Sequence, residues 1–192
     1  LDIDRAVSRV RYNLNGIRYT REYFVSHPDK VMVVRLSGSK KGALSFDVKF
    51  QSLLKYESMG NTGVLKVNGY APYHTSPNYW PDENPVRFDK DRGTRFSTYF
   101  KVVNRGGTVK VTDSTIQVKN ADEAMVLVSM ATSFNGFDKD PAKEGVDNKA
   151  IAQKQLADAS AKSYRALKQE HLQDYQSFFK RVTLNLEGSE TP

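Results

Sequence analysis

The sequence predicts a mainly β fold: an antiparallel β-sandwich followed by a C-terminal pair of α-helices and a final short strand. Strand-like runs separated by turn residues recur over the first two thirds of the 192 residues, as in sandwich domains. Ten tyrosines and ten phenylalanines suit the faces of packed sheets. After residue 137 the pattern changes to helical spacing. The length favours one domain, or one domain with an appendage.

The first strands are expected between residues 4 and 50. Runs 4–13 and 17–25 flank the turn residues of Asn13 to Gly16, which predict a hairpin. Residues 31–36 are almost all apolar, as in a strand covered on both faces. In residues 44–50 apolar and polar side chains alternate, which indicates a half-buried strand.

Residues 70–90 interrupt the strand pattern. The segment contains four prolines, with tyrosines and a tryptophan among them, so it cannot be a regular central strand. A connection of this length usually has a functional or packing role. The residues concerned are Pro72, Pro77, Pro81, Pro85, Tyr70, Tyr73, Tyr79 and Trp80.

Further strands are expected on either side of that segment. Residues 64–69 form a short one, and in residues 94–103 the side chains of Phe96, Phe100 and Val102 share one face. Asn104 to Gly107 is predicted to be a hairpin turn. The strands predicted after this turn are 109–111, 116–118 and 124–131.

The C-terminal part is predicted to be helical. Asp147 or Asn148 is a suitable N-cap for a helix over 149–161, and Ser163 for a second helix ending at Phe179. One face of the second helix collects Tyr164, Leu167, His171, Tyr175 and Phe178. Alternation at Val182, Leu184 and Leu186 predicts the final strand.

Composition excludes several classes of site. The chain has no cysteine, which excludes disulfides, thiolate metal sites and a cysteine nucleophile. No apolar run approaches the roughly 20 residues of a membrane span. The net charge of +7 could suit nucleic acid, but the basic residues are spread along strands, which favours ordinary solvated faces. The chain starts without Met or a leader pattern, so we expect a processed product or a fragment.

Candidate binding residues gather in the 70–90 segment. His74 lies near Tyr79, Trp80 and Asn78, a combination that could bind a sugar through ring faces and hydroxyl contacts. The favoured alternative is that these aromatics bury the loop against the sheet or another domain. His27 is expected in a turn, and His171 as a packed helix residue.

The acidic residues predict neither a metal site nor a hydrolytic pair. Asp138, Asp140, Glu144 and Asp147 do not match the spacing of a calcium loop. The pairs Asp82/Glu83 and Asp89/Asp91 lie in a polar loop without the apolar burial that would raise a carboxyl pKa. No catalytic residue, metal or cofactor is therefore predicted.

Several short motifs occur in an order shared with one known family. In that order the chain resembles the amino-terminal region of glycoside hydrolase family 95, the α-L-fucosidase family, over essentially its whole length. The motifs are 1–6, 19–24, 69–77 (Gly-Tyr-Ala-Pro-Tyr-His-Thr-Ser-Pro), 92–96 (Arg-Gly-Thr-Arg-Phe), 121–124 (Ala-Asp-Glu-Ala), 131–137 (Ala-Thr-Ser-Phe-Asn-Gly-Phe), 171–175 (His-Leu-Gln-Asp-Tyr) and 178–182 (Phe-Phe-Lys-Arg-Val).

The resemblance implies a sandwich of the super-sandwich type, then a helical linker, then an (α/α)₆ barrel that performs inverting hydrolysis of fucosylated glycans. The family's barrel motifs and its glycine-rich opening are not present here, so we expect an internal, non-catalytic fragment of a periplasmic or secreted parent. Its expected parts are a sandwich at 1–137, a linker at 138–180 and a terminal strand at 181–192.

In such a parent, the loops Tyr70–Asp91 and Ser133–Asp138 are the candidates for contact with the barrel or with the edge of its sugar site, because loops cluster at the ends of a sandwich. The candidates lie in two loops: His74, Asn78, Tyr79 and Trp80 in one, and Phe134, Asn135 and Phe137 in the other. Three alternatives stay open: a stand-alone carbohydrate-binding module, a parent acting on a related sugar such as an α-L-galactoside, and a nucleic-acid-binding β domain.

Overall fold

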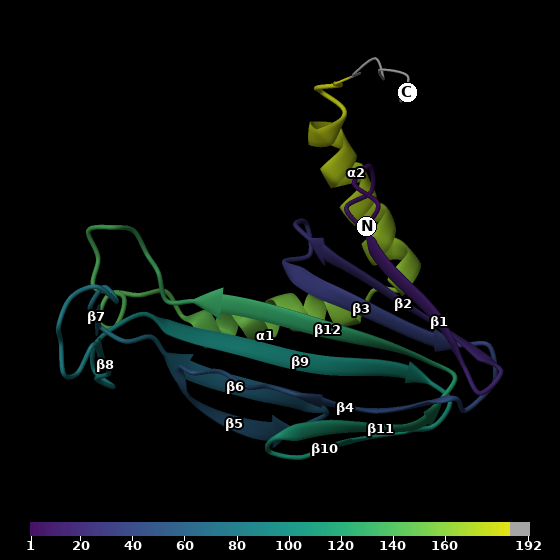
Figure 1. The fold of residues 1–192 in the computed structure, drawn as a ribbon, viewed down its shortest axis with the longest axis horizontal. Helices are drawn as coiled ribbons and strands as arrows, with labels where there is room; N and C mark the ends of the chain where they lie inside the picture. Colours follow the sequence, from purple (N-terminus) through teal and green to yellow (C-terminus); the bar gives the residue numbers. More distant parts are fainter. Residues whose placement is uncertain (185–192) are drawn as a thin grey trace.

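The chain folds into three layers, as the computed structural model of residues 1–184 shows (Figure 1). A seven-stranded antiparallel sheet forms the middle layer, in the order β1-β2-β3-β12-β9-β6-β5. Its strands are β1 (Ser8–Leu14), β2 (Ile17–Ser26), β3 (Val31–Gly38), β5 (Lys55–Asn61), β6 (Val64–Tyr70), β9 (Arg95–Arg105) and β12 (Glu123–Thr132).

A three-stranded sheet covers part of one face of the large sheet. Its order is β10-β11-β4, formed by β4 (Leu44–Lys49), β10 (Thr108–Val111) and β11 (Thr115–Ala121). Leu65, Ile116 and Val118 are buried between the two sheets. This packing of two sheets confirms the predicted antiparallel sandwich, and the alternation in residues 44–50 predicted the buried face of β4.

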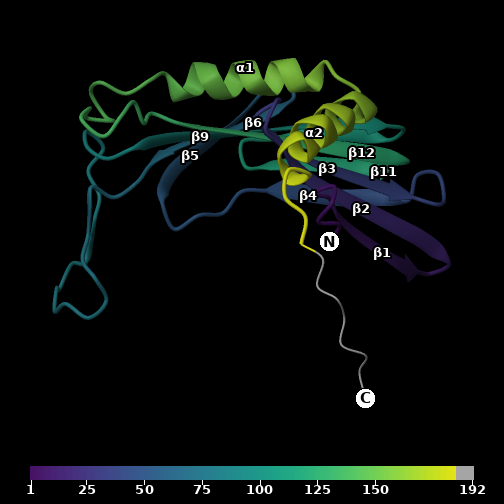
Figure 2. The same cartoon turned by 90° about the horizontal axis from the view of Figure 1, so that it is seen from above.

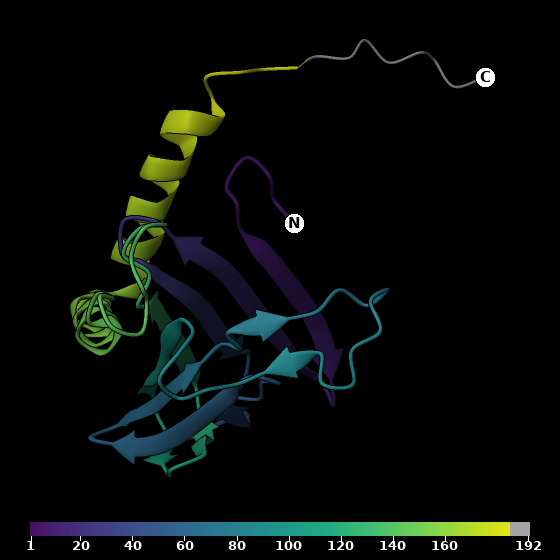
Figure 3. The same cartoon turned by 90° about the vertical axis from the view of Figure 1, so that its left-hand side faces the viewer.

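Helices cover the opposite face. Helix α1 (Asn148–Ser160) lies along it, as Figure 2 shows, and α2 (Tyr164–Phe179) begins there and projects beyond the sheet (Figure 3). Leu127, Leu156 and Leu167 are fully buried between sheet and helices. Asp147 and Ser163 cap the two helices through their side chains, as predicted.

Strand β12 is covered on both faces, which explains the apolar run from Val126 to Val128. Adjacent side chains of a strand point to opposite faces. Val126 therefore packs in the core between the sheets, and Leu127 packs in the core under the helices. The turn after β1 is also as predicted: Asn15 and Gly16 have φ of 51° and 74°, the left-handed pair of a tight hairpin.

Strand β5 was not predicted. Its side chains are exposed or half-buried, with Lys55, Glu57 and Met59 on one face, because it is an edge strand that only β6 pairs. An alternation of apolar and polar residues marks a strand with one buried face. An edge strand without a buried residue does not show that alternation.

The predicted hairpin at Asn104 to Gly107 is wrong. The glycines at 106 and 107 do turn the chain, with φ of 70° and 64°, but β9 pairs with β12 and β6, while β10 pairs with β11. The turn therefore passes the chain from one sheet to the other.

The predicted terminal strand lies mostly outside the described residues. Residues 181–184 form no strand. Within residues 1–184, no helix is long and apolar enough to span a membrane.

Candidate functional site

Two long loops leave the same end of the large sheet (Figure 1). One connects β6 to β9 over residues 71–94, and the other connects β12 to α1 over residues 133–147. Their bases are joined, because the Arg95 N–H donates to Ser133 Oγ at 2.9 Å and the Ser133 N–H donates to the Arg95 carbonyl at 3.0 Å. The seven predicted contact residues all lie in these loops.

The 71–94 segment is built as a small hairpin. Strands β7 (His74–Thr75) and β8 (Val86–Arg87) pair only with each other, which agrees with the prediction that prolines keep this segment out of the main sheet. Further backbone hydrogen bonds, such as Ala71 N–H to the Thr94 carbonyl at 2.9 Å, hold its two limbs together.

Asp82 braces the outer part of this hairpin. Its carboxylate accepts hydrogen bonds from Ser76 Oγ at 2.5 Å and from Arg87 Nη2 at 3.0 and 3.2 Å. The Asn84 N–H donates to it at 2.9 Å. The hydrogen bond from Ser76, followed by that of the Asn84 amide, lowers the pKa of Asp82. Asp82 is therefore an ionised structural group, as expected from its lack of apolar surroundings.

The hairpin presents aromatic rings to solvent. Tyr79 is 83% exposed and Trp80 66%, and Asn78 and His74 are exposed beside them. His74 Nε2 lies 3.1 Å from Ser76 Oγ. The alternative that these aromatics bury the loop against the sheet is wrong for this chain, which leaves them free for a sugar or another domain.

The 133–147 loop also exposes rings. Phe134 is 60% exposed and Phe137 98%. Asn135 serves the loop itself, since its Nδ2 donates to the Glu144 carbonyl at 2.9 Å. Of the seven predicted residues, the four large exposed aromatics are therefore the strongest contact candidates.

Substituting Asp82 with asparagine is expected to loosen the 71–94 hairpin without changing the global unfolding midpoint. Asparagine loses the ion pair with Arg87, but the segment contributes nothing to the main core. Amide hydrogen exchange should become faster at Asn84 and Ser76. Asp91→Asn removes the same charge elsewhere in the loop and should leave these rates unchanged; equal acceleration in both variants would contradict the bracing role.

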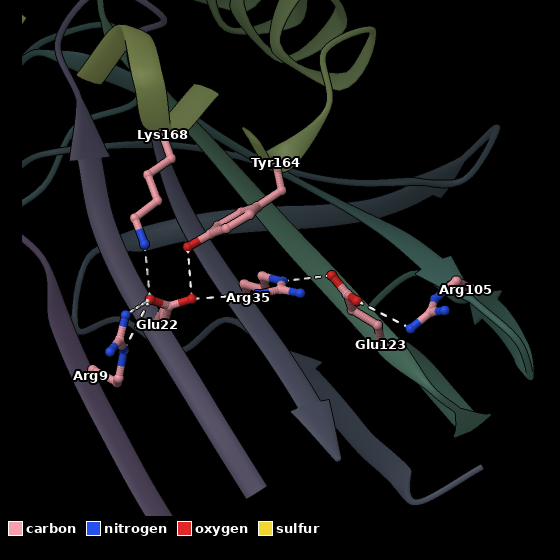
Figure 4. Close-up of polar contacts among 7 residues, drawn as sticks. All are labelled: Arg9, Glu22, Arg35, Arg105, Glu123, Tyr164 and Lys168. Atoms are coloured by element: carbon pink, nitrogen blue, oxygen red, sulfur yellow. Dashed lines mark hydrogen bonds and ion pairs between the residues drawn. The ribbon is translucent and has the colours of Figure 1, made fainter. Parts of the chain in front are cut away.

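A second candidate region joins α2 to the sheet through a buried carboxylate (Figure 4). Glu22 on β2 is 5% exposed and contacts side chains from three other elements. Its Oε1 lies 2.7 Å from Arg9 Nη2 and 3.0 Å from Lys168 Nζ. Its Oε2 accepts from Tyr164 OH at 3.0 Å.

The network continues across the sheet. Arg35 lies 3.5 Å from Glu22 Oε2 and donates to Glu123 Oε1 at 2.6 Å, and Arg105 contacts the other oxygen of Glu123 at 3.4 Å (Figure 4). The Arg35 guanidinium also lies 4.7 Å from the centre of the Tyr164 ring. Four cations thus surround two carboxylates in a row across the sheet. Helix α2 is attached at the Glu22 end of this row, through Tyr164 and Lys168.

The electrostatics of this row favour charged carboxylates. Burial alone would raise the pKa of Glu22, but hydrogen bonds from Arg9, Lys168 and Tyr164 outweigh it and lower the pKa to about 2. Burial, followed by the charge of Glu22, raises the pKa of Tyr164. The two carboxylates are thus ionised partners of the neighbouring cations, which gives the network a structural role.

The start of α2 is anchored a second time. Lys162, between the helices, donates to Asp29 Oδ1 at 2.7 Å, and Ser26 Oγ donates to the same carboxylate at 2.5 Å. The hydrogen bond with Asp29, followed by that with Glu170, raises the pKa of Lys162. These contacts tie the corner between α1 and α2 to the turn between β2 and β3.

Farther along α2, aromatic side chains stack in a ladder. His171 lies 4.8 Å from the Phe24 ring and 6.1 Å from that of Tyr175, which lies 5.1 Å from Phe179. His171 is 4% exposed and contacts the Arg5 carbonyl at 3.0 Å, so the prediction of a packed histidine is confirmed. Phe178 is 59% exposed and is not one of the stacked rings.

Sequence reasoning missed the Glu22 network. Glu22 looks like one polar position of an alternating strand, and its partners on α2 are 142 and 146 positions away. The sequence held only a weak signal. Glu22 lies two residues before the buried Phe24, so its side chain points to the same face of the strand. Among residues 1–184, no group of three or more His, Cys, Asp or Glu side chains is arranged to hold a metal ion.

Comparisons with known proteins give a matching protein family and several similar proteins. Residues 1–136 match the family model described as glycosyl hydrolase family 65, N-terminal domain. The chain is 31% identical over 198 aligned positions to "Alpha-L-fucosidase 2" of Arabidopsis thaliana, covering 100% of the chain and 24% of that protein. It is 29% identical to "Probable alpha-fucosidase A" of Aspergillus niger, covering 97% of the chain and 23% of that protein.

A solved structure, "Putative kojibiose phosphorylase from human microbiome", is 10% identical with a TM-score of 0.47, covering 94% of the chain and 24% of that protein. The chain spans about a quarter of the length of the curated relatives. Their names agree with the α-L-fucosidase resemblance of the sequence. The family model matches most of the chain, from the first residue to the end of the large sheet, so the chain belongs to the family described as glycosyl hydrolase family 65, N-terminal domain.

Proposed function

We propose that the chain is a non-catalytic N-terminal domain of an α-L-fucosidase that acts on fucosylated glycans by inverting hydrolysis. The observation that supports this most directly is the alignment of the whole chain with an α-L-fucosidase four times as long. The remaining three quarters of such a protein have room for a separate catalytic barrel.

The carboxylates of the chain support a non-catalytic role. Glycoside hydrolysis needs one carboxyl group with a raised pKa to act as general acid. Hydrogen bonds with cations and hydroxyls instead lower the pKa of Glu22, Asp82 and Glu123. Each of these groups is an ionised partner in a structural contact.

The surface of α2 supports a role in docking the barrel. An open, mainly apolar groove of about 390 Å³ runs between β2 and the outer half of α2, with Val25, Tyr175, Phe178 and Phe179 among its lining residues. Val25 is 67% exposed, and Val182 and Leu184 are about 80% exposed beyond the helix. We infer that the barrel covers this groove, and that the exposed rings of Trp80 and Phe137 contact its rim.

The assay for this proposal compares the isolated chain with a longer form that includes the downstream region. On an aryl α-L-fucoside the isolated chain is expected to show no turnover above background, whereas the longer form is expected to hydrolyse it. Turnover by the repurified isolated chain would contradict the non-catalytic role. Hydrolysis of an aryl α-L-galactoside in preference to the fucoside would contradict the proposed sugar.

A stand-alone carbohydrate-binding module is the second candidate, because Tyr79 and Trp80 are exposed on a braced hairpin. Titration calorimetry distinguishes a carbohydrate-binding module from a supporting domain. Binding of fucosylated glycans by the isolated chain, abolished by Trp80→Ala, would favour the module over the supporting domain.

A further inference from the structure

A polar groove of about 540 Å³ lies on the helix side of the sheet, between the edge strands β5 and β6 and the first turn of α1. It is separate from the exposed rings of the two loops and from the apolar groove on α2. Helix α1 packs over β9 and β12, and Figure 2 shows it along this face of the sheet. Strands β5 and β6 thereby form an open floor beside it.

Strand register defines that floor. Lys55, Tyr70 and Arg95 are cross-strand neighbours in one row. Glu57 and Asn68 form the next row, which continues to Ser97 beneath the start of α1. The wall is α1, because Asn148 Nδ2 donates to Ser97 Oγ at 2.8 Å and the exposed Lys149 follows it.

The side chain of Asn68 is oriented by the core. Its Oδ1 accepts from Ser97 Oγ at 2.7 Å and from Tyr99 OH at 3.3 Å. Both hydrogen bonds go to the oxygen, so the amide nitrogen keeps its N–H donors for other partners, and Asn68 is one of the residues that line the groove. A donor held in this way needs no reordering when a ligand arrives.

Two of the cations are also held in place by neighbouring rings. The Arg95 guanidinium lies 5.3 Å from the centre of the Tyr70 ring, and Lys55 Nζ lies 5.7 Å from that of Phe88. Phe88 in turn packs edge-on against Tyr70. The groove therefore combines fixed cations, an amide donor and an aromatic side chain.

The charges of the lining residues select the ligand. Lys55, Arg95 and Lys149 are opposed by a single carboxylate, Glu57. Cations and an amide donor suit a carboxylate or sulfate group, while Glu57 can accept hydrogen bonds from sugar hydroxyls. A dense polyanion such as nucleic acid would bring a phosphate close to Glu57, which disfavours it.

We propose that this groove binds an anionic oligosaccharide, one that bears uronate or sulfate groups. The inference goes beyond the proposed fucosidase function: it gives the domain a contact with acidic glycan that is distinct from hydrolysis. It does not depend on which sugar the parent cleaves.

The test uses titration calorimetry of the full 192-residue chain with four probes. These are an oligogalacturonide, a sulfated oligofucoside, a neutral oligosaccharide of equal length and a single-stranded oligonucleotide. At least one acidic saccharide is expected to bind, about tenfold or more tightly than the neutral one, and to weaken as salt is raised. The difference between the two acidic probes identifies the anionic group.

Variants then locate the site. Lys55→Ala combined with Lys149→Ala is expected to weaken acidic-saccharide binding about tenfold, since two cationic contacts are lost. Lys119→Ala combined with Lys154→Ala removes the same charge from exposed positions outside the groove and should leave binding unchanged. Equal losses in both double variants would overturn the proposal, as would equal binding of the neutral saccharide, tighter binding of the oligonucleotide, or no binding of either acidic probe. The fucoside assay tests the parent function independently of all these outcomes.

Discussion

Replacing Glu22 with glutamine is expected to lower the free energy of unfolding by about 3 kcal/mol. Glutamine keeps the shape of the side chain but leaves Lys168 and Arg9 facing a neutral group in a largely buried position. Urea unfolding followed by circular dichroism measures the change. Asp158→Asn is the matched control, because its pair with Lys154 is exposed and should contribute less than about 0.5 kcal/mol.

The Glu22→Gln substitution should also change how the free energy of unfolding depends on pH. The folded pKa of Glu22, about 2, lies below its ordinary value of 4.5. Ionised Glu22 therefore stabilises the fold fully above about pH 4.5, and this contribution is lost as the pH falls toward 2. The difference in stability between the wild type and Glu22→Gln should narrow by about 2–3 kcal/mol over this range. A constant difference would show that Glu22 is not the titrating partner.

Truncating Leu167 to alanine is expected to cost about 2–5 kcal/mol, the largest effect that we expect on α2. Leu167 is fully buried in the core beneath the helix, so the change leaves a cavity where α2 meets the sheet. Denaturant midpoints measure the loss, and protease cleavage within α2 should become faster.

Phe178→Ala provides the contrast on the same helix. Phe178 is 59% exposed, so its removal should change the stability of the isolated chain by less than about 1 kcal/mol. If the outer end of α2 docks the barrel, Phe178→Ala should instead lower the stability of the longer protein. A large loss in the isolated chain would mean that Phe178 packs within this domain.

The C-terminal helices were predictable because their signals are local. Asp147 and Ser163 cap the helices through their own neighbouring backbone amides. The spacing of Leu167 and His171 identified the buried side of α2 correctly. It also placed Phe178 on that side. Phe178 does line the groove there, but the ring stacked on Tyr175 is that of Phe179.

The candidate site was predictable only in part. Prolines and aromatics identified the 71–94 segment as an exposed, irregular element, and the exposure of Trp80 follows from it. The contacts that brace it did not follow, because Asp82 acts through Ser76 and Arg87, which are ordinary loop residues in the sequence. The groove between α1 and β5 was also beyond sequence reasoning, because β5 itself has no apolar signal.

The sequence by itself determined the class of the fold, the position and caps of both helices, and the relatives that the chain resembles. Each of these depends on residues close together in the chain, or on motif order. Only the tertiary structure decided that β9 and β10 belong to different sheets, that Glu22 meets Lys168, and that Asn148 closes a groove above Asn68. The physical reason is distance along the chain. Pairing, ion networks and grooves bring together residues separated by tens to more than a hundred positions, and single positions in a sequence carry no record of such partners.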